Sequence, residues 1–309
     1  MSTFESRKKQ RELNEKLIKF ALIGAATVSI LTTFGILFSI LFEAIEFFKL
    51  RSFWYFVTGT VWSPGVIGSQ FGALPIFAGT FVITIIALAV AIPIGLGSAI
   101  YMSEYASPKL RDYLKPMLEV LAGIPTVVYG FFAAITVAPL VVKIAESVGL
   151  EATFNSALAS GIVMGIMIIP VISSLSDDVI RAVPDSQRKA VFGLGMTHGE
   201  TIRNIVLPSA MPGIISASLL GLSKALGETM IVVMAAGLRP NLSWNPLEDM
   251  TTVTVTIVNS LVGDFEFNSP DTLSAFALGL ILFIVTLILN MISLSLIRKF
   301  KEKYKVNTL

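Results

Sequence analysis

The chain has 309 residues, of which 54% are hydrophobic and only 14% are charged, with a formal net charge of +2 and no cysteine. Because a soluble domain carries about 25% charged residues, this composition indicates a polytopic membrane protein. The small net charge argues against a nucleic-acid partner, and the lack of cysteine excludes disulfides and thiolate metal sites. The single histidine excludes a histidine cluster that could hold a metal.

The chain begins with a basic, polar segment over residues 1–17, which is followed by an apolar stretch at 18–42. This stretch is longer than the roughly 7–15 residues of a signal-peptide core, and no cleavage site follows it. We therefore expect a cytoplasmic N-terminal segment and a first membrane span that is retained.

Five further stretches are long enough to cross a bilayer. A hydrocarbon core about 30 Å thick requires about 20 apolar residues in a helix. Since lipid offers no hydrogen bonds to the backbone, each stretch is predicted to be helical. The fold is therefore predicted to be all-α, with six transmembrane helices at 18–42, 76–102, 116–141, 155–175, 213–236 and 273–297.

The positive charges predict the orientation of these spans. Of the 23 Lys and Arg residues, 18 lie in or beside the N-terminal segment, in the loops 103–115 and 176–212, or in the C-terminal tail 298–309. The three other loops hold only four. Cytoplasmic loops carry the excess of Lys and Arg, so both termini are predicted to be cytoplasmic.

The predicted outer loop 43–75 is rich in aromatic residues. Such residues form interfacial belts or short helices that lie on the membrane, and they also form docking surfaces for an extracytoplasmic partner. The sequence leaves both interpretations open and favours the first. The aromatic residues are Phe47, Phe48, Phe53, Trp54, Tyr55, Phe56 and Trp62.

The predicted cytoplasmic loop 176–212 contains signals for several short helices. Ser176 is a candidate N-cap for a turn that ends near Pro184. A second helix is predicted to start at Asp185 or the next residue and to stop at Gly195, because glycine often follows the last residue of a helix.

A capping box opens a third helix in this loop. Thr197 and Glu200 have the spacing T-x-x-E, and we expect Pro208 to end the helix. The second helix places Ala190 and Leu194 on one apolar face. A helix of this kind fits the groove of another protein, or it lies at the membrane interface without a partner. Local physics leaves both interpretations open.

The spacing within this loop resembles the coupling loop of permease subunits in ABC importers. The family signature reads EAA, three residues, Gly, nine residues and I-x-L-P, and four residues stand in register with it: Gly195, Ile205, Leu207 and Pro208. The resemblance implies that a separate ATPase contacts the loop. The residues then assigned to coupling are Arg188, Lys189, Ala190, Gly195, Thr197, Glu200, Ile205, Leu207 and Pro208.

Other stretches resemble the PstC-type permeases of phosphate ABC importers, with a family core over 76–297 of a transmembrane domain at 18–297. The resemblance implies a multi-pass permease of the cell membrane that imports phosphate. Its implied partners are a homologous PstA-type permease, a cytoplasmic ATPase dimer and an extracytoplasmic phosphate-binding protein. The stretches are TGTVWSP (58–64), FGALP (71–75), IPIGLGSAIYMSEYA (92–106), EVLAGIPTVVYGFFA (119–133) and KALGETMIVVMAAG (224–237).

The sequence contains no G-x-x-x-x-G-K followed by Ser or Thr, so the chain has no nucleotide-binding loop of that kind. We therefore expect no enzymatic activity and no cofactor in this chain, with ATP bound by the partner subunit. Two alternatives stay open. One is an ABC permease for another oxyanion or solute, such as molybdate or sulfate, and the other is a secondary transporter or channel that acts alone.

Two charged residues, Lys224 and Glu228, fall within the predicted span 213–236. With a rise of 1.5 Å per residue from Gly213, they lie about 16 Å and 22 Å deep, near the middle of the bilayer. Residues four apart share a helix face, and charges inside a membrane mark functional sites by default. We expect this pair to line a translocation path, with a structural ion pair as the alternative.

The sequence departs from the family at three positions. Lys189 stands where the family usually has Glu, Val191 where it has the second Ala, and Lys224 where PstC-type permeases usually carry Arg. Lysine offers a point charge rather than a bidentate fork. The departure at Lys224 therefore keeps a cationic path but does not imply a specific phosphate clamp.

Overall fold

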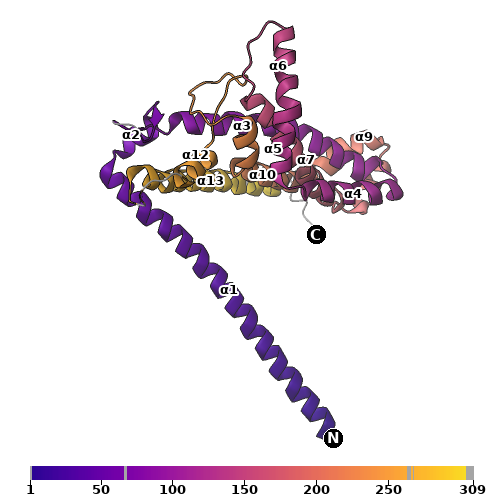
Figure 1. The fold of residues 1–309 in the computed structure, drawn as a ribbon. Helices are drawn as coiled ribbons and strands as arrows, with labels where there is room; N and C mark the ends of the chain where they lie inside the picture. The colour runs from indigo at the N-terminus through magenta and orange to yellow at the C-terminus, as the bar shows by residue number, and fades with distance from the viewer. Residues whose placement is uncertain (1, 66–67, 263–265, 267, 304–309) are drawn as a thin grey trace.

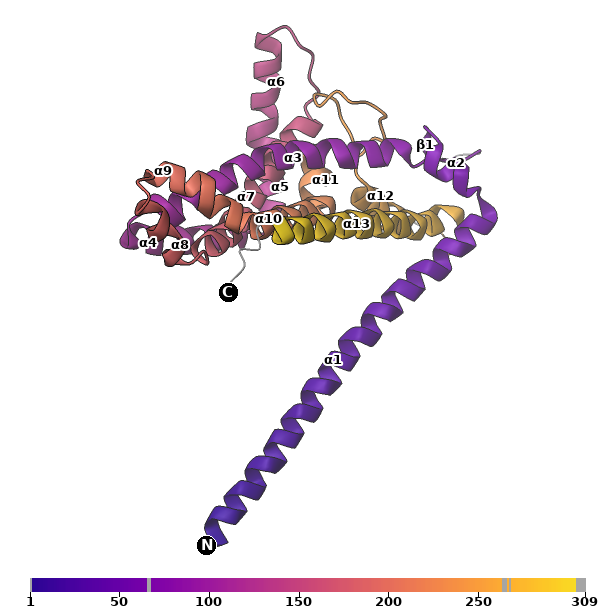
Figure 2. The same ribbon diagram turned by 180° about the vertical axis from the view of Figure 1, so that it is seen from behind.

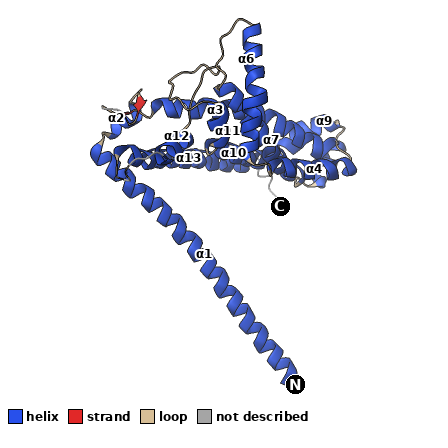
Figure 3. Ribbon diagram, in the orientation of Figure 1, coloured by secondary structure: helices blue, strands red, loops and turns tan. Residues whose placement is uncertain are grey.

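The structure is a computed structural model that describes residues 2–65, 68–262, 266 and 268–303. It is built from helices and one small two-stranded sheet (Figure 3). The helices that form the six spans are α1 (Ser2–Leu50), α3 (Leu74–Ile100), α5 (Thr126–Phe132) with α6 (Ala138–Ser147), α7 (Ala157–Arg181), α9 (His198–Thr201) with α10 (Leu207–Leu226), and α13 (Pro270–Lys303). The remaining elements are α2 (Phe53–Thr58), β1 (Trp62–Ser63), β2 (Gln70–Phe71), α4 (Pro108–Ala122), α8 (Asp185–Phe192), α11 (Met230–Ala235) and α12 (Val253–Val262).

The prediction of six membrane spans is confirmed. Among the described residues, six helical segments are long and apolar enough to cross a membrane. Three of them contain a π-helical turn: η1 (Tyr101–Tyr105) after α3, η2 (Ala133–Val137) between α5 and α6, and η3 (Ile202–Val206) between α9 and α10. The segments are Asn14–Leu50, Leu74–Tyr105, Thr126–Ser147, Ala157–Arg181, His198–Leu226 and Pro270–Lys299.

The spans form an elongated bundle from which two elements project (Figure 1). Helix α7 packs most extensively against α3 and then against α10, while α13 packs against α1, α12 and α10. From the end that carries α2, α1 extends away from the bundle, and α6 stands nearly at right angles to it. Helices α4, α8 and α9 gather at the opposite end (Figure 2).

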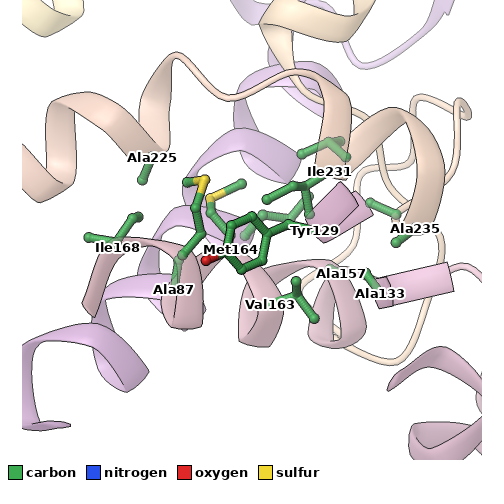
Figure 4. Packing of buried hydrophobic residues seen from close by; sticks show 14 of the residues in the cluster. Ala87, Tyr129, Ala133, Ala157, Val163, Met164, Ile168, Ala225, Ile231 and Ala235 are labelled. Atoms are coloured by element: carbon green, nitrogen blue, oxygen red, sulfur yellow. The ribbon is translucent and has the colours of Figure 1, made fainter. Parts of the chain in front are cut away.

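The contact between α3 and α7 depends on small residues. A Cβ atom at Gly161 would lie 2.7 Å from the side chain of Ile86, and one at Gly165 would lie 2.8 Å from the backbone oxygen of Ala87. Glycines spaced by four in this way let two helix backbones approach closely. Buried residues of α7, including Met164 and Ile168, then fill the core between α3, α5 and α11 (Figure 4).

The aromatic residues of the loop 43–75 are divided between the core and the surface. Phe47, Phe56 and Trp62 are buried in one cluster with Phe71, and their rings meet edge to face. The strands hold this cluster together, since Trp62 pairs with Phe71 in antiparallel register. Trp54, in contrast, is 74% exposed. The interfacial interpretation is therefore wrong for the three buried residues, because their rings pack against one another inside the fold.

Two predicted spans are interrupted. The stretch 116–141 is not one helix, because α4 ends at Ala122 and α5 starts at Thr126. Pro125 separates them, and the residue before a proline is disfavoured in a helix. The stretch 213–236 is also broken, because α10 ends at Leu226 with Gly227 as its C-cap and α11 starts at Met230.

Candidate functional site

The first helix predicted for the loop 176–212 does not exist as a separate element. Helix α7 runs through Ser176 to Arg181, so Ser176 lies inside a helix and is fully buried rather than acting as an N-cap. The apolar pattern continues into the loop, and the buried face of α7 includes Ile180. This packing accounts for the extra turns beyond the predicted span.

The end of α7 is fastened to α4 by ion pairs. Asp177 is completely buried, and its Oδ2 atom accepts a 2.6 Å hydrogen bond from Nη2 of Arg111. This hydrogen bond raises the pKa of the Arg111 guanidinium above its usual value. Asp178 pairs with Lys115 beside it. Arg111 and Lys115 are four apart on α4, so one face of that helix binds both carboxylates.

Helix α8 forms as predicted at its start and ends two residues earlier than predicted. It begins at Asp185 and stops at Phe192, with Gly193 as its C-cap. Gly195 has a φ of +83°, a left-handed conformation that favours glycine, and it turns the chain toward α9. The signature glycine therefore forms the turn itself.

The capping box that opens α9 is confirmed. The Thr197 hydroxyl accepts from the backbone N–H of Glu200, and the Glu200 carboxylate accepts from the backbone N–H of Thr197 at 2.8 Å. Pro208, however, does not end this helix. It lies in the first turn of α10 directly after η3, where proline's missing N–H is tolerated, so the chain stays helical to Leu226.

The residues assigned to ATPase coupling divide into two groups in this structure. Lys189 and Ala190 are exposed on α8, and Leu194 beside them is 83% exposed. Arg188 points the other way, with a side chain only 17% exposed that pairs with Glu104. Ile205, Leu207 and Pro208 are half-buried at the base of the loop; Gly195, Thr197 and Glu200 are exposed.

Lys224 and Glu228 do not share one helix, so the prediction of a common helix face is wrong. Lys224 lies in the last turn of α10, whereas Glu228 lies in the break before α11. Glu228 Oε1 accepts hydrogen bonds from the backbone N–H groups of Met230 at 3.0 Å and Ile231 at 3.3 Å. The carboxylate therefore caps α11, and a carboxylate at a helix N-terminus is favourable.

Threonines at the start of α12 form hydrogen bonds at the break between α10 and α11. Thr254 Oγ1 donates a 2.8 Å hydrogen bond to the backbone oxygen of Glu228, and it lies 3.0 Å from Thr252 Oγ1. The Thr80 hydroxyl of α3 in turn accepts from the backbone N–H of Val253. The break between α10 and α11 is therefore joined to α12 and α3 by polar contacts inside the bundle.

Sequence reasoning missed Glu104, Arg111, Asp177 and Thr254 as parts of these sites. A signal existed for one set only. Arg111 and Lys115 have helical spacing in one basic loop, and Asp177 and Asp178 lie in the next. The pairing of these residues could therefore be predicted from the sequence. The contacts of Glu104 and Thr254 depend on tertiary structure and left no pattern in the sequence.

Comparison with known proteins gives one family and several relatives. The family model described as binding-protein-dependent transport system inner membrane component matches residues 91–305. The probable ABC transporter permease protein YqgH of Bacillus subtilis is 31% identical over 97% of this chain and 95% of its own. The phosphate transport system permease proteins PstC of Mesorhizobium japonicum and Haemophilus influenzae are 34% and 32% identical, over 76% and 80% of this chain and 75% and 82% of theirs.

Solved structures give the same architecture. A chain of a bacterial ABC transporter involved in the import of the acidic polysaccharide alginate superposes with a TM-score of 0.56 at 13% identity, covering 85% of this chain and 95% of its own. A chain of the MetNI methionine ABC transporter in an inward-facing conformation superposes with a TM-score of 0.53 at 16% identity, covering 74% and 94%. At these identities the likeness concerns the fold alone.

Proposed function

The chain belongs to the family of binding-protein-dependent transport system inner membrane components, and we propose that it is the permease subunit of an ATP-driven phosphate importer. The observation that carries the proposal is the extent of the match to phosphate transport system permeases, which spans at least three quarters of this chain at 32–34% identity. Members of this family are non-enzymatic membrane subunits. The chain would therefore conduct the substrate, and a partner would hydrolyse ATP.

The proposed assembly contains a homologous PstA-type permease, two copies of a cytoplasmic ATPase and an extracytoplasmic phosphate-binding protein. Surrounding lipid covers the remaining apolar surface. One support is the large exposed apolar surface of the projecting elements, where Phe34 and Phe38 of α1 and Leu140 and Ile144 of α6 are all more than half exposed. Apolar patches of this kind mark protein or membrane contacts.

We propose that both termini lie in the cytoplasm, with 1–17 as an N-terminal segment, 18–297 as the permease domain and 298–309 as a tail. Residues 304–309 of that tail lie outside the described residues. The distribution of Lys and Arg supports this orientation. Helices α4, α8 and α9 then form the cytoplasmic end, and α2 with its two strands forms the outer end (Figure 2).

The loop 176–212 is proposed to bind the ATPase through the exposed side of α8. This helix has no buried residue and presents Lys189 and Ala190, and the 83% exposed Leu194 lies in the turn directly after it. An amphipathic helix with free apolar side chains fits a groove in another protein. Closure of the ATPase dimer would move this helix and, with it, the spans that α8 contacts.

Lys224 is proposed to lie on the translocation path, with Glu228 beside it. Lys224 is half-buried at the end of α10, and among the described residues it forms no ion pair. A cation held inside a membrane without a carboxylate partner is suited to meeting an anion in transit. Glu228 orders the break next to it by capping α11.

The test is uptake into proteoliposomes that contain the chain with its partner permease and ATPase, with the binding protein outside. Saturable uptake of radiolabelled phosphate that requires both ATP and the binding protein is the expected result. Preferential uptake of sulfate or molybdate would keep the family assignment and overturn the substrate. Uptake by this chain alone without ATP would overturn the role as a permease subunit.

A further inference from the structure

Glu104, in the π-helical turn η1 that follows α3, contacts both halves of the proposed coupling loop. Its Oε1 atom accepts a 2.8 Å hydrogen bond from Nη1 of Arg188 on α8, and its side chain is only 4% exposed. Its backbone oxygen lies 3.2 Å from Nε2 of His198, the first residue of α9. Glu104 therefore holds the helices on both sides of the turn at Gly195.

Arg188 extends this contact to a third helix. Its Nη2 atom donates a 2.9 Å hydrogen bond to the backbone oxygen of Ile180 on the last turn of α7. Breaking a buried ion pair by neutralising one partner is costly, because the other charge stays buried and unpaired. The Glu104–Arg188 pair is thus a defined joint between α8 and the ends of α3 and α7.

Three rings reinforce the same joint. The imidazole of His198 stacks on Phe192, the last residue of α8, with centroids 6.1 Å apart and an angle of 13° between the planes. The same imidazole also meets the ring of Tyr105 edge to face, with centroids 5.2 Å apart. Tyr105 follows Glu104 in η1, so the ion pair and the rings connect the same three elements.

Beneath the joint lies a small apolar core that includes Ala99 of α3, Ile180 of α7, and Val206 and Ala210 after α9. Two π-helical turns flank this core, η1 at the end of α3 and η3 before α10. Turns of this kind occur frequently at functional sites. The loop is therefore attached through a packed base rather than through flexible chain.

We propose that Glu104 is the positioning residue that fixes the coupling loop to the end of α3, so that α8, α9 and η1 move as one body when the ATPase moves α8. This inference rests on the proposed function, because the ATPase supplies the motion. Arg188 then acts inside the permease, and the exposed Lys189, Ala190 and Leu194 are left to contact the ATPase.

The absence of native cysteine makes a direct test possible. Spin labels would be attached at Ser186→Cys on α8 and Tyr101→Cys on η1, both exposed, in the complete reconstituted complex. The distance between the labels is expected to be narrowly distributed and equal with and without bound ATP. In Glu104→Gln the distribution is expected to broaden and to shift with nucleotide, because α8 moves without η1.

The same samples give a functional readout. We expect Glu104→Gln to raise the ATP hydrolysed per phosphate imported about tenfold, a typical size for coupling between sites, in a complex that still assembles. Arg188→Gln is expected to uncouple as well, and the double variant should be no worse than Arg188→Gln alone, since that substitution already removes the interaction with Glu104. Arg181→Gln, which removes an exposed charge at the end of α7, serves as the matched control and should change neither readout.

Unchanged label distances and an unchanged ATP ratio in assembled Glu104→Gln would overturn the inference. If Glu104→Gln does not assemble, Arg188→Lys and Arg188→Gln are compared instead, because lysine keeps the charge opposite Glu104. Arg188→Lys should keep the native label distance and the native ratio of ATP hydrolysed to phosphate imported, whereas Arg188→Gln should change both. Equal behaviour of these two variants would also overturn it. Failure of the proposed function is distinguishable, because a native complex without ATP-driven phosphate uptake would still report the label distances.

Discussion

Two regions of this chain hold charge away from water, and they neutralise it differently. At the end that carries α4, α8 and α9, a basic side chain lies against a carboxylate, as Arg111 does against the fully buried Asp177. At the break between α10 and α11, Glu228 is held by backbone N–H groups, and Lys224 forms no ion pair among the described residues. Charge in the first region is compensated by an opposite charge of the protein, whereas the ammonium group of Lys224 has no carboxylate partner among the described residues.

The largest effect is expected at Lys224. Lys224→Met removes the charge but keeps the length and apolar stem of the side chain, so the fold should persist while an anion loses its partner. Truncating one member of a buried charge pair costs about 2–5 kcal/mol, and we expect phosphate uptake to fall by about 100-fold. The measurement is uptake by proteoliposomes with equal amounts of assembled complex.

Lys224→Arg is the matched control for this change. It keeps the positive charge and should retain most of the uptake. Normal uptake in Lys224→Met would exclude this residue from the translocation path. The lack of a carboxylate partner for Lys224, which distinguishes it from Arg111, would then have no role in transport.

Asp177→Asn tests the first region. Neutralising Asp177 leaves Arg111 without its full charge partner, and breaking a buried ion pair costs about 3–5 kcal/mol of stability. We expect a lower thermal midpoint for the purified chain, and uptake that is reduced only as far as folded protein is lost. Asp178→Asn, at a side chain that is 52% exposed, should cost no more than about 1 kcal/mol. Equal losses in the two variants would contradict this interpretation.

Glu228→Gln distinguishes two roles of the carboxylate at the break, capping of α11 and contact with the substrate. An amide oxygen still accepts hydrogen bonds from Met230 and Ile231, but without charge assistance, at a loss of about 1 kcal/mol. If Glu228 acts as a cap, uptake should fall only about fivefold, far less than in Lys224→Met. A loss as large as that of Lys224→Met would instead indicate contact with the substrate.

Much of the fold was predictable from the sequence because each rule involved is local. Length and hydropathy predict six spans, T-x-x-E predicts the capping box at Thr197, and glycine at position 195 predicts a turn between two helices. These features depend on neighbouring residues or on the bilayer, and the structure confirms them.

Three features of the fold were not predictable from the sequence, because they depend on how particular side chains pack and form hydrogen bonds in the folded chain. The hydropathy is continuous over 213–236 and gives no sign of the break between α10 and α11. The break is stabilised by Glu228, which accepts hydrogen bonds from the first backbone N–H groups of α11. The aromatic residues of the outer loop have the composition of an interfacial belt, yet Phe47 and Phe56 pack against each other. Helix α7 continues past Ser176, where Ile180 is buried and Asp177 pairs with Arg111 of α4. The partner of Asp177 lies 66 residues away in another helix, so no local pattern indicates it.

The smallest predicted effect concerns the capping box at the start of α9, in the same region as Asp177. Thr197→Ala removes the hydroxyl that accepts from the backbone of Glu200, and loss of such a cap costs about 1 kcal/mol. Thermal unfolding should show a small decrease, and Thr197→Ser, which keeps the hydroxyl, should show almost none. If Thr197→Ala also raised the ATP hydrolysed per phosphate imported, the cap itself would be needed for coupling as well as for stability. A drop in stability alone would place the cap with Asp177, among the contacts that only hold the fold.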